Sequence, residues 1–325
     1  MNIQAGLDIS KRNIIAPLKV VLKRSGSIES VHRVHAVVSD EKGRILMRAG
    51  NAHLETFIRS SLKPFQVLPL ISSGASEKFN YGEKAIAICC ASHNGSPLHA
   101  REAFKVLWNA DIDVDFLQCP TPVGRKSPLE HNCSGKHAGF LATCKKMNWP
   151  LETYLKGNHP LQVEVFRRVA ELLGLPPEEL LAARDDCGAP TLRLELSQMA
   201  MLYAHLGSSK QAQIEAISRA MVSNPELIAG IKRFDTELML RAHRQVVSKG
   251  GAEGIQCISR LSDGIGLAIK VEDGSARAKR AVALHLLRQL EWLTPTGLQE
   301  LEEQVLVINP GVELEVQGEL KFLES

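Results

Sequence analysis

The sequence lacks the features that mark membrane proteins, exported proteins and nucleic-acid-binding proteins. Its 325 residues contain no run of about 18 apolar residues, so no membrane-spanning helix is expected. The first twenty residues are charged at Asp8, Lys11 and Arg12 and have no small-residue cleavage site, so they do not indicate a signal peptide. Aromatic residues make up only 5% and the net charge is +3, which argues against a nucleic-acid partner. We therefore expect a cytoplasmic protein.

The number and spacing of the cysteines do not indicate a disulfide framework either. The seven cysteines are odd in number and include the adjacent pair Cys89 and Cys90, which favours reduced thiols, some of them available as ligands. Hydrophobic residues make up 44% and charged residues 23%, as in an ordinary globular protein. The length allows one large domain or two closely joined ones.

The apolar pattern changes twice along the chain. Residues 17–50 contain β-branched runs with a turn sequence at 40–43, which predicts an antiparallel meander. After Gly250 and Gly251 the strand pattern returns, interrupted by a helix over 276–293. Between them, apolar residues recur every three or four positions and predict helices over 97–110, 158–173, 177–184, 194–206, 209–222 and 236–248.

This order of elements predicts an α+β fold. Strands at both ends of the chain favour one mixed sheet built from about 1–55 and 251–325, with a helical part at about 56–250 inserted between them. We expect the two parts to form a single catalytic unit.

The strongest candidate for a nucleophile is Ser60, in the run Arg59 to Pro64. Lys63 follows three positions later, so in a helix its amine can reach the Ser60 hydroxyl. Pro64 is tolerated in the first turn of a helix, which places Ser60 at the helix start. The alternative interpretation is a helix cap at Ser60 and a solvated lysine.

Two more stretches could contribute to the same chemistry. Ser92 and His93 follow an apolar helix and place a second hydroxyl at a chain reversal, although a capping and turn role is the commoner explanation for such a cluster. Lys270 lies in an apolar strand, and if it points inward its pKa falls and it can act as a base. On a strand edge Lys270 would be ordinary.

Two small-residue segments carry thiols. Cys133, Lys136 and His137 lie within five positions before a helix, and Cys187 follows Asp185 and Asp186 in a turn. Cys133 could instead be a buried small hydrophobic residue. The two cysteines could hold zinc together, but the usual Cys-x-x-Cys or His-x-x-x-His spacing is missing, so spacing alone indicates a metal only weakly.

At these stretches the chain resembles the L-asparaginase II family, the class 3 or inducible, thermolabile type. The matching blocks run over nearly the whole length: ESVHR at 29–33, RSSLKPFQVLPL at 59–70, CASHNGSP at 90–97, HNCSGKHAGFLATC at 131–144, DDCGAPTLRL at 185–194, RFDTELM at 233–239 and DGIGLAIKVEDG at 263–274. The resemblance implies a fold similar to serine β-lactamases and to the glutaminases that share it. It also implies a homodimer that hydrolyses L-asparagine to L-aspartate and ammonia.

The resemblance further implies two serine–lysine tandems and a zinc site. The tandems fall on Ser60 with Lys63 and on Ser92 with Lys270, and the zinc ligands fall on Cys133, Lys136 and Cys187. His131 stands where the family commonly has asparagine, and Asp186 where it commonly has glycine. The extra carboxylate beside Cys187 could alter the affinity for metal.

These residues support a hypothesis of acyl transfer. Ser60 attacks the amide carbon and a neutral Lys63 accepts its proton, with Arg59 and Lys270 as the neighbouring cations that lower the pKa of Lys63. Ser92 relays protons to Lys270. The zinc would orient the substrate, and Arg59, His93, Asp185 and His137 are the further candidates for binding substrate or orienting ligands.

Three other functions compete with this one. A glutaminase is possible because one methylene is worth only about 1–3 kcal/mol of discrimination. A protein that acts on β-lactams shares the Ser-x-x-Lys pattern, but Lys270 is followed by Val271 and Glu272, so the Lys-Thr-Gly motif is missing. A non-catalytic amino-acid-binding or metal-binding protein would keep the thiols without needing Ser60.

Overall fold

The computed structural model describes residues 15–208, 210–306 and 309–323. Most of the first twenty residues, on which the expectation of no signal peptide rests, lie outside these ranges. Within them, no helix is both long enough and apolar enough to cross a bilayer.

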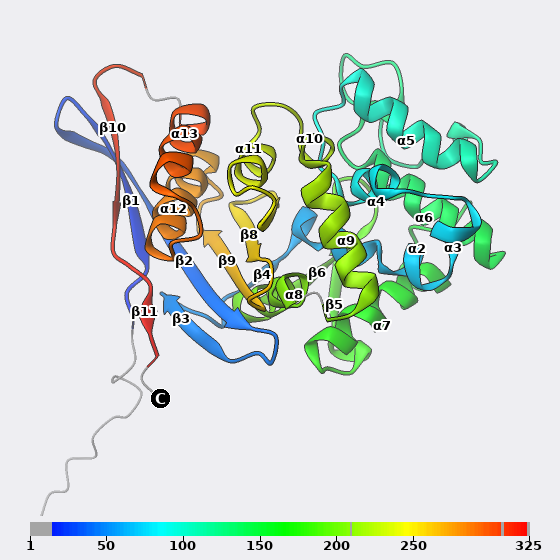
Figure 1. Ribbon diagram of the computed structural model, residues 1–325, viewed down its shortest axis with the longest axis horizontal. Coiled ribbons are helices and arrows are strands. Elements are labelled where there is room, and N and C mark those ends of the chain that lie inside the picture. Colours follow the sequence, from blue (N-terminus) through cyan, green and yellow to red (C-terminus); the bar gives the residue numbers. More distant parts are fainter. Residues whose placement is uncertain (1–14, 209, 307–308, 324–325) are drawn as a thin grey trace, which may run out of the picture.

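The main sheet is built from the two ends of the chain (Figure 1). Its central order is β10-β1-β2-β9-β8-β7, and β3 pairs with β2 and β11 beside this path. Its strands are β1 (Leu18–Arg24), β2 (Ser27–Asp40), β3 (Ile45–Ala49), β7 (Val246–Gly250), β8 (Ile255–Arg260), β9 (Ile265–Val271), β10 (Val312–Gln317) and β11 (Lys321–Phe322).

The predicted α+β architecture, with a sheet from both termini, is confirmed, but the sheet is not mixed. Every pair of described strands in it is antiparallel, including β1 with β10 and β2 with β9, which join the N-terminal and C-terminal segments. Hairpins link β1 to β2, β7 to β8 and β8 to β9, and such short connections require antiparallel neighbours.

Each face of the sheet is covered by helices. On one face, α12 (Ala276–Gln289) and α13 (Pro295–Val305) bury an apolar cluster that includes Leu18, Ile269 and Leu286. On the other face, α8 (Leu196–Ser208) packs on β9 and β2. A Cβ on Gly266 would lie 2.1 Å from the carbonyl oxygen of Ala200, so only glycine allows this close approach.

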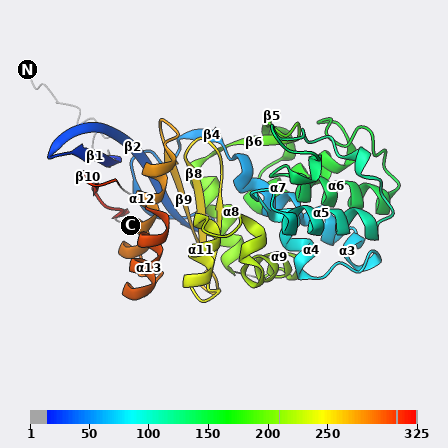
Figure 2. The same cartoon turned by 90° about the horizontal axis from the view of Figure 1, so that it is seen from above.

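The helical part lies beside the sheet along the long axis of the molecule, as both views show (Figures 1 and 2). A small antiparallel sheet in the order β4-β6-β5 connects the two parts: β4 (Glu55–Phe57), β5 (Leu181–Arg184) and β6 (Pro190–Glu195). The remaining helices are α1 (Lys63–Gln66), α2 (Leu68–Ser72), α3 (Ala75–Lys78), α4 (Glu83–Cys90), α5 (Pro97–Asn109), α6 (Ser134–Met147), α7 (Pro160–Leu173), α9 (Ala212–Ser223), α10 (Pro225–Ile228) and α11 (Phe234–Arg241).

Three predicted helices differ from the structure. The helix predicted over 177–184 is a short 3-10 turn, Pro177–Glu179, followed by strand β5. The one predicted over 194–206 begins as strand β6 and becomes helical only at Leu196. The one predicted over 236–248 ends at Arg241, and β7 follows as the edge strand of the main sheet. The sheet part therefore takes in residues 246–250, which the sequence placed in the helical part.

Candidate active site

A cavity of about 440 Å³ opens between the edge of the main sheet and the helical part. Segments that are far apart in sequence meet here: the turn before α1, the loop after α4, the loop before α6, the start of α11, the β7–β8 connection and the start of α12. Its lining residues are Ser60, Ser92, His93, Asn132, Ala229, Arg233, Phe234, Asp235, Gly250, Gly251, Ala252, Gln256, Ala276, Lys279 and Arg280.

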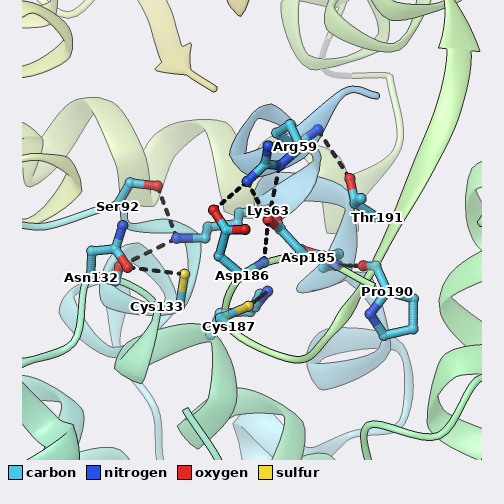
Figure 3. A network of polar contacts seen from close by, with 12 residues as sticks. Arg59, Lys63, Ser92, Asn132, Cys133, Asp185, Asp186, Cys187, Pro190 and Thr191 are labelled. Carbon is cyan, nitrogen blue, oxygen red and sulfur yellow. Dashed lines mark hydrogen bonds and ion pairs between the residues drawn. The ribbon is translucent and has the colours of Figure 1, made fainter. Parts of the chain in front are cut away.

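Ser60 lies in a 3-10 turn, η2 (Arg59–Leu62), whose first residue has an unusual backbone. Arg59 has φ = 53°, in the left-handed region, which costs a non-glycine residue about 1–3 kcal/mol. Its N–H donates to Thr191 Oγ1, and its guanidinium lies 2.8 Å from Asp185 Oδ1 and 2.6 Å from Asp186 Oδ2 (Figure 3). These contacts hold the strained turn that presents Ser60 to the cavity.

Lys63 begins α1, and Pro64 follows in the first turn as the sequence predicts. Its amine is buried and does not bond to Ser60. Instead it donates to the Ala91 carbonyl (2.6 Å), to Ser92 Oγ (2.8 Å) and to the Asn132 carbonyl (3.3 Å). Three acceptors match the three N–H groups of an ammonium ion, so this arrangement suits a charged Lys63 rather than the neutral base proposed from the sequence.

Ser92 lies between two amines. Its Oγ is 2.8 Å from Lys63 Nζ and 2.7 Å from Nζ of Lys249, which is buried on β7 and also donates to the Gly250 carbonyl. The pKa of Lys249 is lowered to about 7, chiefly by burial; the charge of Asp235 opposes the shift, and the charges of Lys63 and Lys279 add to it. Lys249 is therefore the amine that can be neutral near neutral pH.

The predicted tandem of Ser92 with Lys270 is a mistaken pairing. Lys270 Nζ donates to the carbonyls of Glu253 (2.5 Å) and Val271 (2.9 Å). Lys249 pairs with Cys257 on β8, whereas Lys270 lies on β9 opposite Ile255. Because side chains alternate along a strand, both lysines are on one face, but β8 lies between their strands, so Lys270 is two strands farther in and two residues along. Lys249 takes the place that the sequence predicts for Lys270.

His93 lines the cavity, but both of its ring nitrogens are occupied. Nδ1 accepts the N–H of Gly95 at 3.1 Å, so Nε2 carries the proton and donates to Ser134 Oγ at 3.0 Å. The ring stacks on His99 with centroids 4.8 Å apart. Burial lowers the pKa of His93 well below its usual value. His93 is thus a neutral side chain that lines the cavity, and its hydrogen bonds stabilise the loop that carries Ser92.

The structure brings together the three predicted zinc ligands, Cys133, Lys136 and Cys187, which are all buried behind Asn132. We call this group the thiol pocket. Lys136 Nζ lies 3.1 Å from Cys187 Sγ, and Cys133 Sγ contacts Asn132 Oδ1 at 3.3 Å. A hydrogen bond with Cys187 lowers the pKa of Cys133 well below its usual value. Burial alone would lower the pKa of Lys136, but the two sulfur atoms outweigh it and raise that pKa. Two thiols and an amine therefore converge on one small space.

The pocket also has an orphaned polar atom that bears on whether a metal fits. His137 Nδ1 hydrogen-bonds Tyr154 Oη at 2.7 Å, but its buried Nε2 has no hydrogen-bond partner among the described residues. No group of three or more histidine, cysteine, aspartate or glutamate side chains with metal-site geometry occurs in the described part of the chain. A site here would depend on Lys136 as its third donor, and two soft thiolates with one nitrogen donor suit zinc.

The spacing between the Ser92 loop and the thiol pocket is set by Gly135. Helix α6 begins at Ser134 and packs on α4, whose C-terminal end leads into Ser92. A Cβ on Gly135 would lie 2.0 Å from the carbonyl oxygen of Ile88, which is a backbone atom and cannot move aside. A glycine at this position is therefore needed for the two helices to approach so closely.

Of the four residues predicted from the sequence to bind substrate, only His93 lines the cavity. Arg59 and Asp185 pair with each other, and His137 is fully buried behind the thiol pocket. The cationic residues that do line it were missed: Arg233, Lys279 and Arg280. Arg233 is the first residue of the block at 233–239 that resembles the family. That resemblance was the only sign in the sequence that Arg233 belongs to the site.

Comparison with known proteins gives one match that covers nearly the whole chain. The sequence profile of the L-asparaginase II family matches residues 20–322. No curated protein matches the sequence.

Solved structures match at low identity. Mglu in its tris and glutamate form is 12% identical, with a TM-score of 0.43 over 80% of this chain and 60% of that one, so this chain spans about three fifths of its length. A β-lactamase from Mycobacterium bovis is 12% identical, with a TM-score of 0.43 over 84% and 95% of the two chains. A Bacillus glutaminase is 12% identical, with a TM-score of 0.36 over 80% and 91%.

Proposed function

Because the chain belongs to the L-asparaginase II family, we propose that it is an amidohydrolase that converts L-asparagine to L-aspartate and ammonia, with Ser60 as nucleophile. The observation that carries this proposal is the position of Ser92 Oγ, within 2.8 Å of Lys63 Nζ and 2.7 Å of Lys249 Nζ, at a cavity that Ser60 also lines. Two amines of different protonation around one hydroxyl provide both an acid and a base.

In the first half-reaction Ser60 Oγ attacks the side-chain amide carbon of asparagine. Ser60 gives its proton to the Ser92 hydroxyl, and Ser92 gives its own hydroxyl proton to the neutral amine of Lys249. The tetrahedral intermediate collapses as the C–N bond breaks. The departing nitrogen receives a proton from the amines through Ser92 and leaves as ammonia, and an aspartyl ester remains on Ser60.

In the second half-reaction a water molecule attacks the ester carbon. Lys249 again accepts a proton through Ser92, the bond from carbon to Ser60 Oγ breaks, and the proton returns to Ser60. Ser60 lies in the first turn of η2, where backbone N–H groups have no intrahelical acceptors, so its own N–H can stabilise the oxyanion.

The α-carboxylate of asparagine has two cationic partners in the cavity. Arg233 is exposed, and its guanidinium bonds to no other described residue. Arg280 makes one long hydrogen bond, 3.4 Å, to the Val305 carbonyl. Guanidinium groups bind carboxylates through paired charge-assisted hydrogen bonds, so these two side chains would hold the end of the substrate away from Ser60.

The thiol pocket fits the zinc that the family resemblance implies. Cys133, Lys136 and Cys187 would hold the ion, with Lys136 losing its proton to do so. A bound zinc would supply positive charge that orients the polar end of the substrate. His137, which lies beside Cys187, and Asp185 are the nearby groups that can orient the ligands.

Ammonia release with asparagine tests the proposal directly. Ser60→Ala should abolish release, whereas Ser76→Ala, which removes a hydroxyl that donates to Glu77 on α3, should leave it intact. Activity retained in Ser60→Ala would refute the assignment of the nucleophile. The same assay with glutamine measures the competing glutaminase activity, and faster turnover of glutamine would replace asparagine as the substrate.

We also propose that the protein acts in the cytoplasm as a homodimer. The family resemblance supports the dimer, and light scattering on the purified full chain tests it.

A further inference from the structure

A single buried carboxylate, that of Asp235, accepts hydrogen bonds from both chain neighbours of Lys249. Asp235, in the first turn of α11, accepts the hydroxyl of Ser248 on Oδ1 at 2.7 Å and the N–H of Gly250 on Oδ2 at 2.9 Å. These are the residues immediately before and after Lys249. The third donor is Gln256 Nε2, 2.9 Å from Oδ1 and also 2.9 Å from Ser248 Oγ.

This network fixes the direction of the Lys249 side chain. β7 is an edge strand of the sheet, so on one of its sides no described strand pairs with it. The Asp235 bonds from α11 replace a strand partner over residues 248–250. Because a shift of one residue along a strand reverses its side chains, a clamp on both neighbours keeps the amine aimed at Ser92.

Asp235 also differs in charge from the other groups around Lys249. Among the described titratable groups that face the amine, Asp235 is the one carboxylate. These groups are Asp235 on α11, Lys63 on α1, Lys279 on α12, Cys90 on α4, Cys133 before α6 and Cys257 on β8. Burial raises the pKa of Asp235, but Lys249 and the three donors outweigh burial and the pKa is lowered, so the group is ionised. It therefore opposes the two neighbouring cations.

We propose that Asp235 is the positioning residue for Lys249: it holds both neighbours of the lysine in place and supplies the one negative charge beside its amine among the described residues. The inference rests on the proposed function for the role of Lys249 as base. Asp235 does not touch the reacting atoms, because its oxygens are taken up by Ser248, Gly250 and Gln256.

The test is the pH profile of Asp235→Asn in the full-length protein. The substitution keeps the size of the side chain and removes its charge. Without the anion, burial and the two cations act unopposed, so the rising limb of kcat/KM against pH should move to lower pH by about one unit or more. A purely structural role would lower kcat at every pH without moving the limb, and that result would overturn the proposal.

A second readout does not depend on turnover. In the Ser60→Ala background, lysines labelled at Cε with ¹³C report the titration of Lys249 by NMR, with Lys249→Arg identifying the signal. The apparent pKa should lie near 7 with Asp235 present and lower with Asn. The same titration in both proteins would overturn the proposal even if asparagine hydrolysis were confirmed, and a shift would support it even if the substrate were different.

Ser248→Ala is the matched variant that keeps the charge. It removes one bond of the clamp, so kcat should fall several-fold with the limb unmoved, and unchanged kcat would contradict the positioning role. If Asp235→Asn does not fold, which thermal unfolding shows, Ser248→Ala carries the test of positioning by itself.

Discussion

The hydroxyl of Ser92 lies 2.7 Å from the amine of Lys249, although 157 positions separate the two residues in the chain. One comes from the loop after α4 in the helical part, and the other from the edge strand β7 of the sheet. The site thus exists only when the two parts are joined, and the main predictions concern this junction.

Exchanging the two candidate lysines separates the structural site from the one expected from the sequence. Lys249→Met should lower kcat/KM by about 10²–10⁴-fold, the usual range for loss of a general acid–base group, whereas Lys270→Met should keep most of the activity. Ammonia release at saturating and limiting asparagine measures both. Loss of activity in Lys270→Met, with the fold intact by circular dichroism, would restore the original assignment.

The rate should depend on pH in a direction set by Lys249. Its pKa is lowered to about 7, and the base must be neutral, so activity should be low below that value and rise through it. The measurement is kcat/KM from acid to alkaline pH in buffers of constant ionic strength. A limb near the ordinary pKa of lysine would show that Lys249 is not the base.

The two aspartates that meet Arg59 should differ in their contribution to stability. Asp185 is 11% exposed at its side chain and Asp186 is 91% exposed, although both bond to the guanidinium. Asp185→Ala should cost about 1–3 kcal/mol of unfolding free energy, because it leaves a mostly buried cation half-paired. Asp186→Ala should cost less than about 1 kcal/mol. Urea unfolding measures both, and equal losses would contradict the argument from burial.

The thiol pocket predicts a specific pattern of metal loss. Protein purified without chelator should contain zinc, and Lys136→Met and Cys187→Ser should each lose it. Cys144→Ser, on the same helix α6 but outside the pocket, should keep it. Zinc affinity should be weaker at about pH 6 than at about pH 8, since the amine and thiols must lose protons to bind. Full zinc content in Lys136→Met would remove that residue from the ligand set.

The sequence located the parts of the site that local pattern can reveal. Ser60, Lys63 and Pro64 form a recognisable helix start, and the thiols with Lys136 lie in a crowded run of small residues. The sheet from both termini followed from a change of periodicity. Lys249 could not be found in this way, because the apolar residues of β7 continue the helical spacing of α11 and only pairing with Cys257 makes the segment a strand.

The same limit applies to Arg59 and Asp235. The left-handed backbone at Arg59 is enforced by Thr191, Asp185 and Asp186, which lie more than 120 positions away. Asp235 looks like an ordinary acidic residue at a helix start, and its role emerges only from the donors on β7 and β8. Long-range contacts of this kind leave no trace in local spacing.

Gly135 bears on how this enzyme can be redesigned. The hydrogen atom in place of a side chain there determines how far apart the Ser92 hydroxyl and the Lys136 amine stand, although Gly135 contributes no side chain to either place. A mutation that moves Ser92 will also move the thiol pocket, and the reverse, because the two are positioned by the packed helices α4 and α6. Variation in substrate size is therefore better sought at Arg233 and Arg280, on the far elements of the cavity.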